Sequence, residues 1–212
     1  NTPIASNTSA IPITLLQSKR KHPARFLGMH WAEPAYSTRF LELIRGDQTS
    51  DKALASATEL ATRTHKEPSI VRQDVAGFIV NRLGYAMYRE AVHLLETGVG
   101  DAETIDRAFR NGCGLWAAFC GPFRWIDITG GPALYAKAME RVLPTLCNSP
   151  ELPKTLKDMW ASEDRGIING RGFYSYEKGA AAHWEAEFHE YAWEVWRQQQ
   201  QYHPLDDSEN ES

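Results

Sequence analysis

A histidine and a glutamate lie 12 positions apart in a stretch that can bring their side chains together. His30 lies near the end of one apolar run, Phe26–Trp31, and Glu42 lies inside a second, Phe40–Ile44. Such short runs are typical of buried strands. If the two strands pack side by side, the carboxylate can orient the imidazole, and a histidine held in this way is a general base. The alternative is a histidine satisfied by a backbone carbonyl and a glutamate on a solvated face.

The elements that would position this pair form an alternating pattern over residues 1–73. The sequence predicts a strand, a helix, two strands, a helix and a final strand, which is an α/β arrangement. The polar residues between the two central strands include Glu33-Pro34, which no strand would carry through. The predicted elements are a strand at Pro3–Ser6, a helix at Pro12–Gln17, strands at Phe26–Trp31 and Phe40–Ile44, a helix capped by Thr49 or Ser50, and a strand at Ser69–Arg72.

From Asp74 onward the pattern becomes helical. A long amphipathic helix is predicted from Asp74 to Gly98, and a second from Asp101, an N-cap acid, to Gly112. Further helices are predicted near Pro132–Leu146 and Leu152–Trp160, followed by a last helix with Trp184, Phe188, Tyr191 and Val195 at helical spacing. We predict an α/β region at 1–74, a helical region at 75–178, and an extension at 179–212 that ends in a disordered acidic tail.

Composition narrows the class of function. The 212 residues are 42% hydrophobic and 24% charged, with a net charge of −4 and a pI near 6.0, so nucleic acid and anionic membrane are not expected as partners. No apolar run approaches the ~20 residues of a membrane helix. The three cysteines, Cys113, Cys120 and Cys147, lack CxxC spacing. We therefore expect no metal site, and reduced thiols in a cytoplasmic protein.

No phosphate-cradling loop is present in these 212 residues, because none of the glycine-rich stretches has G-x-G-x-x-G or P-loop spacing. The chain opens with Asn1, and its first residues read as the middle of a domain. We expect that an upstream part is missing and that the chain alone is inactive.

Six segments, in order, resemble the 3-hydroxyacyl-CoA dehydrogenase family. They are SNTSAIPI, RFLGMHWAEP, FLELI, DVAGFIVNRL, GCGLWAAFCGPFRWIDITG and GRGFYSY, and the resemblance runs from about residue 1 to residue 176. The resemblance implies the C-terminal half of a Rossmann-type NAD-binding domain followed by a helical C-terminal domain. It also implies NAD as the cofactor, a small-molecule substrate and a homodimer formed through the helical domain.

The resemblance assigns roles to particular residues. His30 matches the catalytic histidine of the family and Glu42 matches its glutamate partner. Ser9 and Asn81 match residues that bind the substrate, while Asn7 and Ser9 fall where the family approaches the nicotinamide ribose. Read without the resemblance, Ser9 could instead cap the helix that follows. Asn81 could instead form a hydrogen bond between helices.

The implied reaction is the NAD-dependent oxidation of a 3-hydroxyacyl-CoA to the 3-ketoacyl-CoA, a step of fatty-acid β-oxidation. The chain departs from the family pattern at Trp31, at Glu33, which stands where the family usually has Asn, and at Ile168, which replaces a common lysine. These differences leave open a 3-hydroxy-acid dehydrogenase without CoA, similar to gulonate dehydrogenase. A non-enzymatic dimerisation or binding module is a further alternative.

Overall fold

The computed structural model describes residues 2–205, so the acidic tail predicted to be disordered, 206–212, lies outside the described residues. The chain divides into two compact units. Unit 1 consists of Asn1–Tyr85 together with Phe188–Ser212, and unit 2 is Ala86–Glu187. The division falls within two helices, α3 (Val80–Glu96) and α9 (Ala180–Tyr202).

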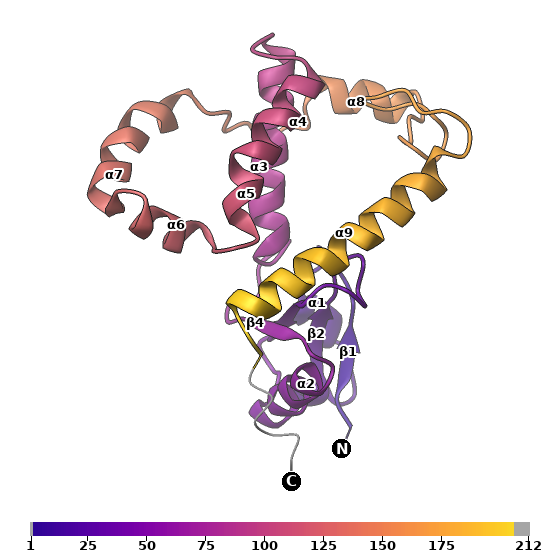
Figure 1. Cartoon of the computed structure of the whole chain (residues 1–212). Helices are drawn as coiled ribbons and strands as arrows, with labels where there is room; N and C mark the ends of the chain where they lie inside the picture. Colours follow the sequence, from indigo (N-terminus) through magenta and orange to yellow (C-terminus); the bar gives the residue numbers. More distant parts are fainter. Residues whose placement is uncertain (1, 206–212) are drawn as a thin grey trace. The chain divides into compact units, whose positions relative to one another are not determined.

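Unit 1 is built on a four-stranded sheet with the strand order β1-β2-β3-β4. Figure 1 labels β1, β2 and β4 of this sheet. The first two strands are parallel, the middle pair is antiparallel, and the last two are parallel. The predicted order of strands and helices over residues 1–73 is confirmed. The elements are β1 (Ile4–Ser6), α1 (Ile13–Gln17), the 3-10 helix η1 (Pro23–Arg25), β2 (Phe26–His30), β3 (Phe40–Ile44), α2 (Asp51–Arg63) and β4 (Glu67–Val71).

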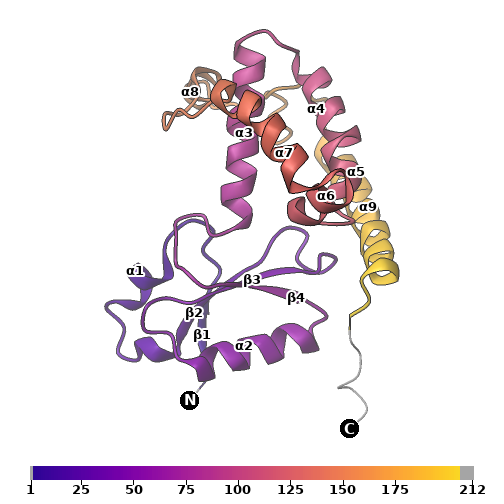
Figure 2. The same ribbon diagram turned by 90° about the vertical axis from the view of Figure 1, so that its left-hand side faces the viewer.

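One face of the sheet is covered by α2 (Figure 2). Ser50 begins this helix as predicted, because its side chain accepts a hydrogen bond from the backbone N–H of Ala53. Alternate residues of the two central strands pack against small residues of the helix, which lets helix and sheet approach closely. The buried residues of this cluster are Leu27, Met29, Leu41, Leu43, Ala57 and Ala61.

The other face carries the remaining residues of the central strands, including His30 and Glu42. Here α1 lies close to the sheet, because a Cβ at Gly28 would be 2.8 Å from Cδ1 of Ile13. A second core cluster forms on this side from Ile13, Phe26, Ile44, Val71 and Phe78. The predicted histidine and glutamate therefore share a face with a packed apolar core.

Two predicted boundaries are wrong for identifiable reasons. The last strand begins at Glu67 and includes Pro68, which is tolerated because β4 is an edge strand. The long helix begins at Val80 instead of Asp74. Gly77 and Phe78 precede it with φ angles of 77° and 51°, in the left-handed region that no right-handed helix contains.

Unit 2 is helical. Asp101 begins α4 as predicted, because its carboxylate accepts a hydrogen bond of 2.8 Å from the backbone N–H of Thr104. Hydrogen bonding to Thr104 also lowers the pKa of the Asp101 carboxyl. Besides part of α3 and α9, the elements are α4 (Ala102–Asn111), α5 (Cys113–Ala117), α6 (Pro122–Ile128), α7 (Gly131–Val142), the 3-10 helix η2 (Leu143–Thr145) and α8 (Lys154–Ala161). The fold is thus α/β followed by all-α, as predicted.

The glycine-rich stretch near residue 170 folds as a tight turn closed by bridges from Arg171 to Gly166 and Ser175. The hydroxyl of Tyr174 donates a hydrogen bond of 2.6 Å to the carboxylate of Asp106 on α4, which fastens the turn. This bond raises the pKa of Tyr174 to about 12. In residues 2–205, no helix is long and apolar enough to span a membrane.

Candidate active site

His30 and Glu42 meet as the sequence predicts. They are direct partners across the antiparallel pair β2–β3, and Nδ1 of His30 lies 2.8 Å from Oε2 of Glu42. Their side chains are 6% and 1% exposed, so the pair is shielded from water. In such surroundings a hydrogen bond between imidazole and carboxylate is stronger than it would be at the surface.

The geometry determines where the imidazole proton lies. An ionised carboxylate only accepts hydrogen bonds, so the neutral His30 ring must carry its proton on Nδ1, facing Glu42. The lone pair then lies on Nε2, which has no hydrogen-bond partner among residues 2–205. His30 is therefore held in the tautomer that can take a proton at Nε2.

The second carboxylate oxygen of Glu42 is bound to the start of α3. Oε1 accepts hydrogen bonds from the backbone N–H groups of Ile79, at 3.0 Å, and Val80, at 2.9 Å. Unpaired N–H groups at a helix N-terminus favour negative charge. These donors compensate the burial of the Glu42 carboxylate without a lysine or arginine. Sequence reasoning missed these contacts.

Two aromatic rings flank the imidazole of His30. The ring centre of Phe40 lies 5.8 Å away in an edge-to-face arrangement, and that of Phe78 lies 5.7 Å away and is tilted. Phe78 is fully buried. The two rings therefore form part of the packed surroundings of the imidazole.

The other predicted site residues lie in the turn after β1 and at the start of α3. The side-chain oxygen of Asn7 accepts a hydrogen bond of 3.0 Å from the backbone N–H of Trp31, the residue after His30. Asn81 donates from Nδ2 to the carbonyl oxygen of Ser9 at 2.7 Å. The structure thus joins Asn7 to the end of β2 and joins Ser9 to Asn81.

The alternatives for Ser9 and Asn81 fail. The N-cap residue of α1 is Pro12 and has no side-chain cap, so Ser9 does not cap that helix. Asn81 bonds to a turn instead of to a neighbouring helix. The hydroxyl of Ser9 and the side-chain carbonyl oxygen of Asn81 form no hydrogen bond with residues 2–205.

The loop after His30 is held by a lysine that sequence reasoning missed. Nζ of Lys66 donates hydrogen bonds to the carbonyl oxygens of Ala35 and Thr38 and lies 5.7 Å from the ring centre of Trp31. Burial lowers the pKa of Lys66. Glu33 is exposed on the same loop, and the described part of the chain shows no hydrogen bond or ion pair between it and His30.

The end of α9 also packs on this loop within unit 1. The guanidinium of the buried Arg39 donates to the carbonyl oxygen of His203 at 2.7 Å and pairs with Glu67 at 3.0 Å. The ring of Tyr36 lies 5.3 Å from that of His189. The C-terminal extension therefore contributes to the surroundings of residues 31–39.

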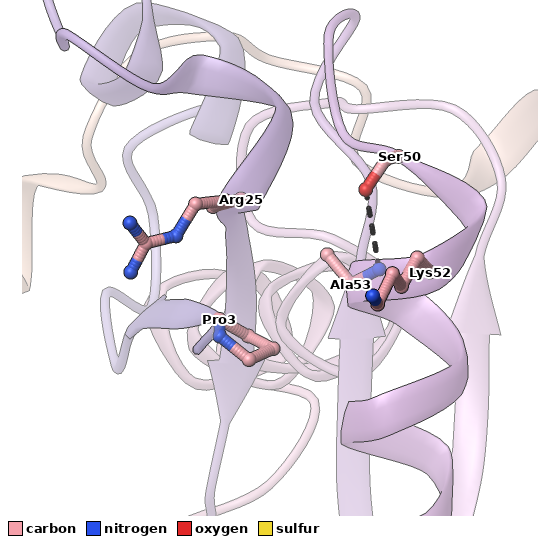
Figure 3. Close-up of a pocket in the computed structure, with 5 residues that line it drawn as sticks. All are labelled: Pro3, Arg25, Ser50, Lys52 and Ala53. Carbon is pink, nitrogen blue, oxygen red and sulfur yellow. Dashed lines mark hydrogen bonds between the residues drawn. The ribbon is translucent and has the colours of Figure 1, made fainter. Parts of the chain in front are cut away.

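A small cavity of about 120 Å³ lies at the amino ends of β1 and β2 (Figure 3). It is lined by Pro3, Arg25, Ser50, Lys52 and Ala53, at the starts of β1, β2 and α2. His30 is the last residue of β2, so this cavity lies at the opposite end of that strand. No group of three His, Cys, Asp or Glu side chains within residues 2–205 could hold a metal ion.

Residues 1–75 match the NAD-binding domain of 3-hydroxyacyl-CoA dehydrogenase, and residues 77–176 match its C-terminal domain. The chain is 34% identical, over 83% of its length and 57% of the relative's, to 5-formyl-3-hydroxy-2-methylpyridine 4-carboxylate 5-dehydrogenase of Mesorhizobium japonicum. It is 32% identical, over 84% of its length and 60% of the relative's, to L-carnitine dehydrogenase of Oceanobacillus iheyensis.

Two solved structures extend the comparison. A crystal structure of the pyridine-carboxylate dehydrogenase, described as an NAD+-dependent dismutase, covers 94% of this chain and 63% of its own, with 31% identity and a TM-score of 0.86. (S)-3-hydroxybutyryl-CoA dehydrogenase from Ralstonia eutropha covers 83% of this chain and 61% of its own, with 35% identity and a TM-score of 0.64.

The chain thus spans less than two thirds of the length of these proteins. Within that span, both domain matches follow each other in order over residues 1–176. The chain therefore belongs to the 3-hydroxyacyl-CoA dehydrogenase family.

Proposed function

We propose that the chain forms the catalytic and helical parts of an NAD-dependent dehydrogenase that oxidises a 3-hydroxyacyl-CoA to the 3-ketoacyl-CoA. The observation that carries this proposal is the buried His30–Glu42 pair, which leaves Nε2 of His30 free to accept a proton. The pair lies at the carboxyl end of β2, which runs parallel to β1. Ligands of α/β folds bind at such strand ends.

His30 acts as the general base. Oxidation of a secondary alcohol removes the hydroxyl proton and, from the carbon, a hydride for which bound NAD is the acceptor. Nε2 of His30 takes the hydroxyl proton, which converts the ring into an imidazolium. Glu42 stabilises that cation and has already fixed the required tautomer, so no reorientation is needed during the step.

Three neutral side chains complete the proposed site. The hydroxyl of Ser9 forms a hydrogen bond with the hydroxyl oxygen of the substrate. Asn81 positions the Ser9 turn by donating to the carbonyl oxygen of Ser9. The side-chain carbonyl oxygen of Asn81 remains available as an acceptor for the substrate. Asn7 and Ser9 are exposed in the turn after β1, as a site for the nicotinamide end of NAD requires. The side-chain oxygen of Asn7 accepts a hydrogen bond from the backbone N–H of Trp31, so the amide N–H₂ group of Asn7 remains available to the ribose.

A hydroxy acid without CoA is the second candidate substrate. The pyridine-carboxylate dehydrogenase superposes on this chain with a TM-score of 0.86, compared with 0.64 for the hydroxybutyryl-CoA enzyme. The residues beyond 176 include the end of α9, which packs on the loop after His30. We propose that this loop, packed against the end of α9, helps to determine which acid is accepted.

Turnover measurements distinguish the two substrate classes. The enzyme to assay is one in which this chain follows a glycine-rich nucleotide-binding segment, here called the completed enzyme. We expect kcat/KM for (S)-3-hydroxybutyryl-CoA to exceed that for free 3-hydroxybutyrate by about tenfold or more, because binding of the CoA part contributes to transition-state stabilisation. A preference for the free acid would support the second candidate, and NADH formation from neither compound would contradict both candidates.

We also propose that the protein is a homodimer that associates through unit 2. Among residues 86–187, all of which the structure describes, Val92 is the only buried hydrophobic side chain. Many large apolar side chains of this unit are exposed, including Leu115, Phe123 and Trp160 at 76%, 83% and 77%. An isolated unit with so little buried apolar surface requires a partner surface.

Light scattering tests the dimer. The 212-residue chain is expected to have twice its monomer mass of 23.9 kDa at micromolar concentration. A mass of one chain throughout that range would contradict association through unit 2.

The three free cysteines, none of them in a disulfide within the described residues, are in keeping with the proposed cytoplasmic location.

A further inference from the structure

Two consecutive residues before α3 adopt the left-handed conformation. Gly77 has a φ of 77°, which costs a glycine nothing, but Phe78 has a φ of 51°. A bulky side chain rarely adopts this conformation, and it persists where the surrounding structure holds it. Phe78 is fully buried in the core cluster that also contains Phe26 and Ile44.

This turn orients the backbone N–H groups that follow it toward Glu42. The next two residues, Ile79 and Val80, donate their N–H groups to Oε1 of Glu42, at 3.0 and 2.9 Å. If Phe78 adopted helical φ and ψ angles, the path of the chain into α3 would change and both N–H groups would turn away. Glu42 would then lose two of its three hydrogen bonds.

The side chain of Phe78 acts on the other member of the pair. Its ring centre lies 5.7 Å from that of His30, and the two planes are inclined at 58°. One residue therefore contacts the imidazole with its ring and sets the partners of the carboxylate with its backbone.

We propose that Phe78 is a positioning residue that keeps His30 in the tautomer with the proton on Nδ1. It acts through Glu42, by holding the Ile79 and Val80 donors in place, and by packing directly on the imidazole. The catalytic importance of this role rests on the proposed function. The positioning itself does not, since it is a property of the 212-residue chain.

Nitrogen NMR of the ¹⁵N-histidine-labelled chain measures the tautomer directly, without substrate or NAD. In the wild-type chain, at a pH where the ring is neutral, we expect His30 to show a protonated Nδ1 and an unprotonated Nε2. In Phe78→Leu we expect both resonances to move toward the averaged values of two exchanging tautomers. Phe26→Leu is the matched control, because Phe26 has the same side chain and lies in the same core cluster.

A second variant tests the backbone without touching the ring. A Cβ at Gly77 would have 3.6 Å to its nearest neighbours, so Gly77→Ala is opposed by the positive φ and not by a clash. We expect this variant to shift the His30 resonances as well. It keeps the proposal testable if Phe78→Leu fails to fold.

The proposal is wrong if Phe78→Leu and Gly77→Ala, folded by their amide spectra, keep the wild-type His30 resonances. It is equally wrong if Phe26→Leu shifts those resonances as much as Phe78→Leu, because the effect would then reflect general loosening of the core. Failure of the proposed function has a different signature. The completed enzyme would then be inactive although the tautomer responds to Phe78 as described.

Discussion

Replacement of His30 by Ala in the completed enzyme is expected to lower kcat about 10²–10⁴-fold, the usual contribution of a positioned acid–base group. The reason is that Nε2 of His30 is the proposed base, on a ring whose Nδ1 lies 2.8 Å from Oε2 of Glu42 at the carboxyl end of β2. Removal of the imidazole leaves the hydroxyl proton to water. KM should change far less than kcat, because the proposed substrate contacts come from Ser9 and Asn81.

His22 supplies the control for this experiment. It is exposed and makes no side-chain cap for the short helix that follows it, so His22→Ala should leave kcat within about twofold of wild type. A loss of less than about tenfold in His30→Ala would mean that another group takes the proton.

Glu42→Gln is expected to lower kcat by a similar factor, about 10²–10⁴-fold, although the two side chains have nearly the same shape. The amide oxygen can still accept from the N–H groups of Ile79 and Val80. The amide N–H₂ group then faces Nδ1 of His30, and because it can only donate, the imidazole must move its proton to Nε2. The ring is then in the tautomer that cannot accept the proton of the substrate.

Glu33→Gln is the matched control, since Glu33 is exposed, lies near His30 in sequence and forms no described ion pair with it. We expect its kcat to stay within about twofold of wild type. If Glu33→Gln abolished turnover and Glu42→Gln did not, the carboxylate that supports His30 would be Glu33, and the assignment of Glu42 as its partner would be wrong. The NMR spectrum of Glu42→Gln should also show Nε2 of His30 protonated.

The sequence was sufficient to predict that His30 and Glu42 meet, because each lies in a short apolar run that forms a strand and because both side chains point to the same face of the sheet. The predicted strand Phe40–Ile44 agrees with β3, and β2 ends one residue before the predicted limit, at His30. Antiparallel pairing with His30 opposite Glu42 then follows from the burial of both. Local pattern and tertiary structure agree at this site.

The contacts that hold the pair could not be read from the sequence. The segment before α3 contains Phe78 and Ile79 at positions that continue a helical pattern, so the apolar periodicity does not indicate the left-handed turn at Gly77 and Phe78. Gly77 was the available signal, since glycine is favoured at positive φ. Lys66 binds carbonyl groups 28 and 31 positions away, and such contacts have no sequence periodicity.

The bond between Asn81 and Ser9 shows the same limit. The family resemblance placed both residues near the substrate, and the structure joins them across 72 positions through a backbone carbonyl. A backbone acceptor carries no residue-type signature, so sequence could identify Asn81 but not its partner. The short helices α5 and α6 were also not predicted; they have five and seven residues and no side-chain cap, and short helices carry little periodicity of their own.

Hydride transfer from a labelled substrate tests the central claim most directly. The completed enzyme is supplied with NAD and 3-hydroxybutyryl-CoA that carries deuterium on carbon 3, and the products are analysed by mass spectrometry. We predict one deuterium in each NADH formed and none in the ketone, at a rate that falls about 10²–10⁴-fold in His30→Ala. Failure of the wild-type enzyme to form deuterated NADH, from this thioester or from deuterated free 3-hydroxybutyrate, would contradict the assignment of His30 and Glu42 as the acid–base pair of a hydroxyl-oxidising dehydrogenase.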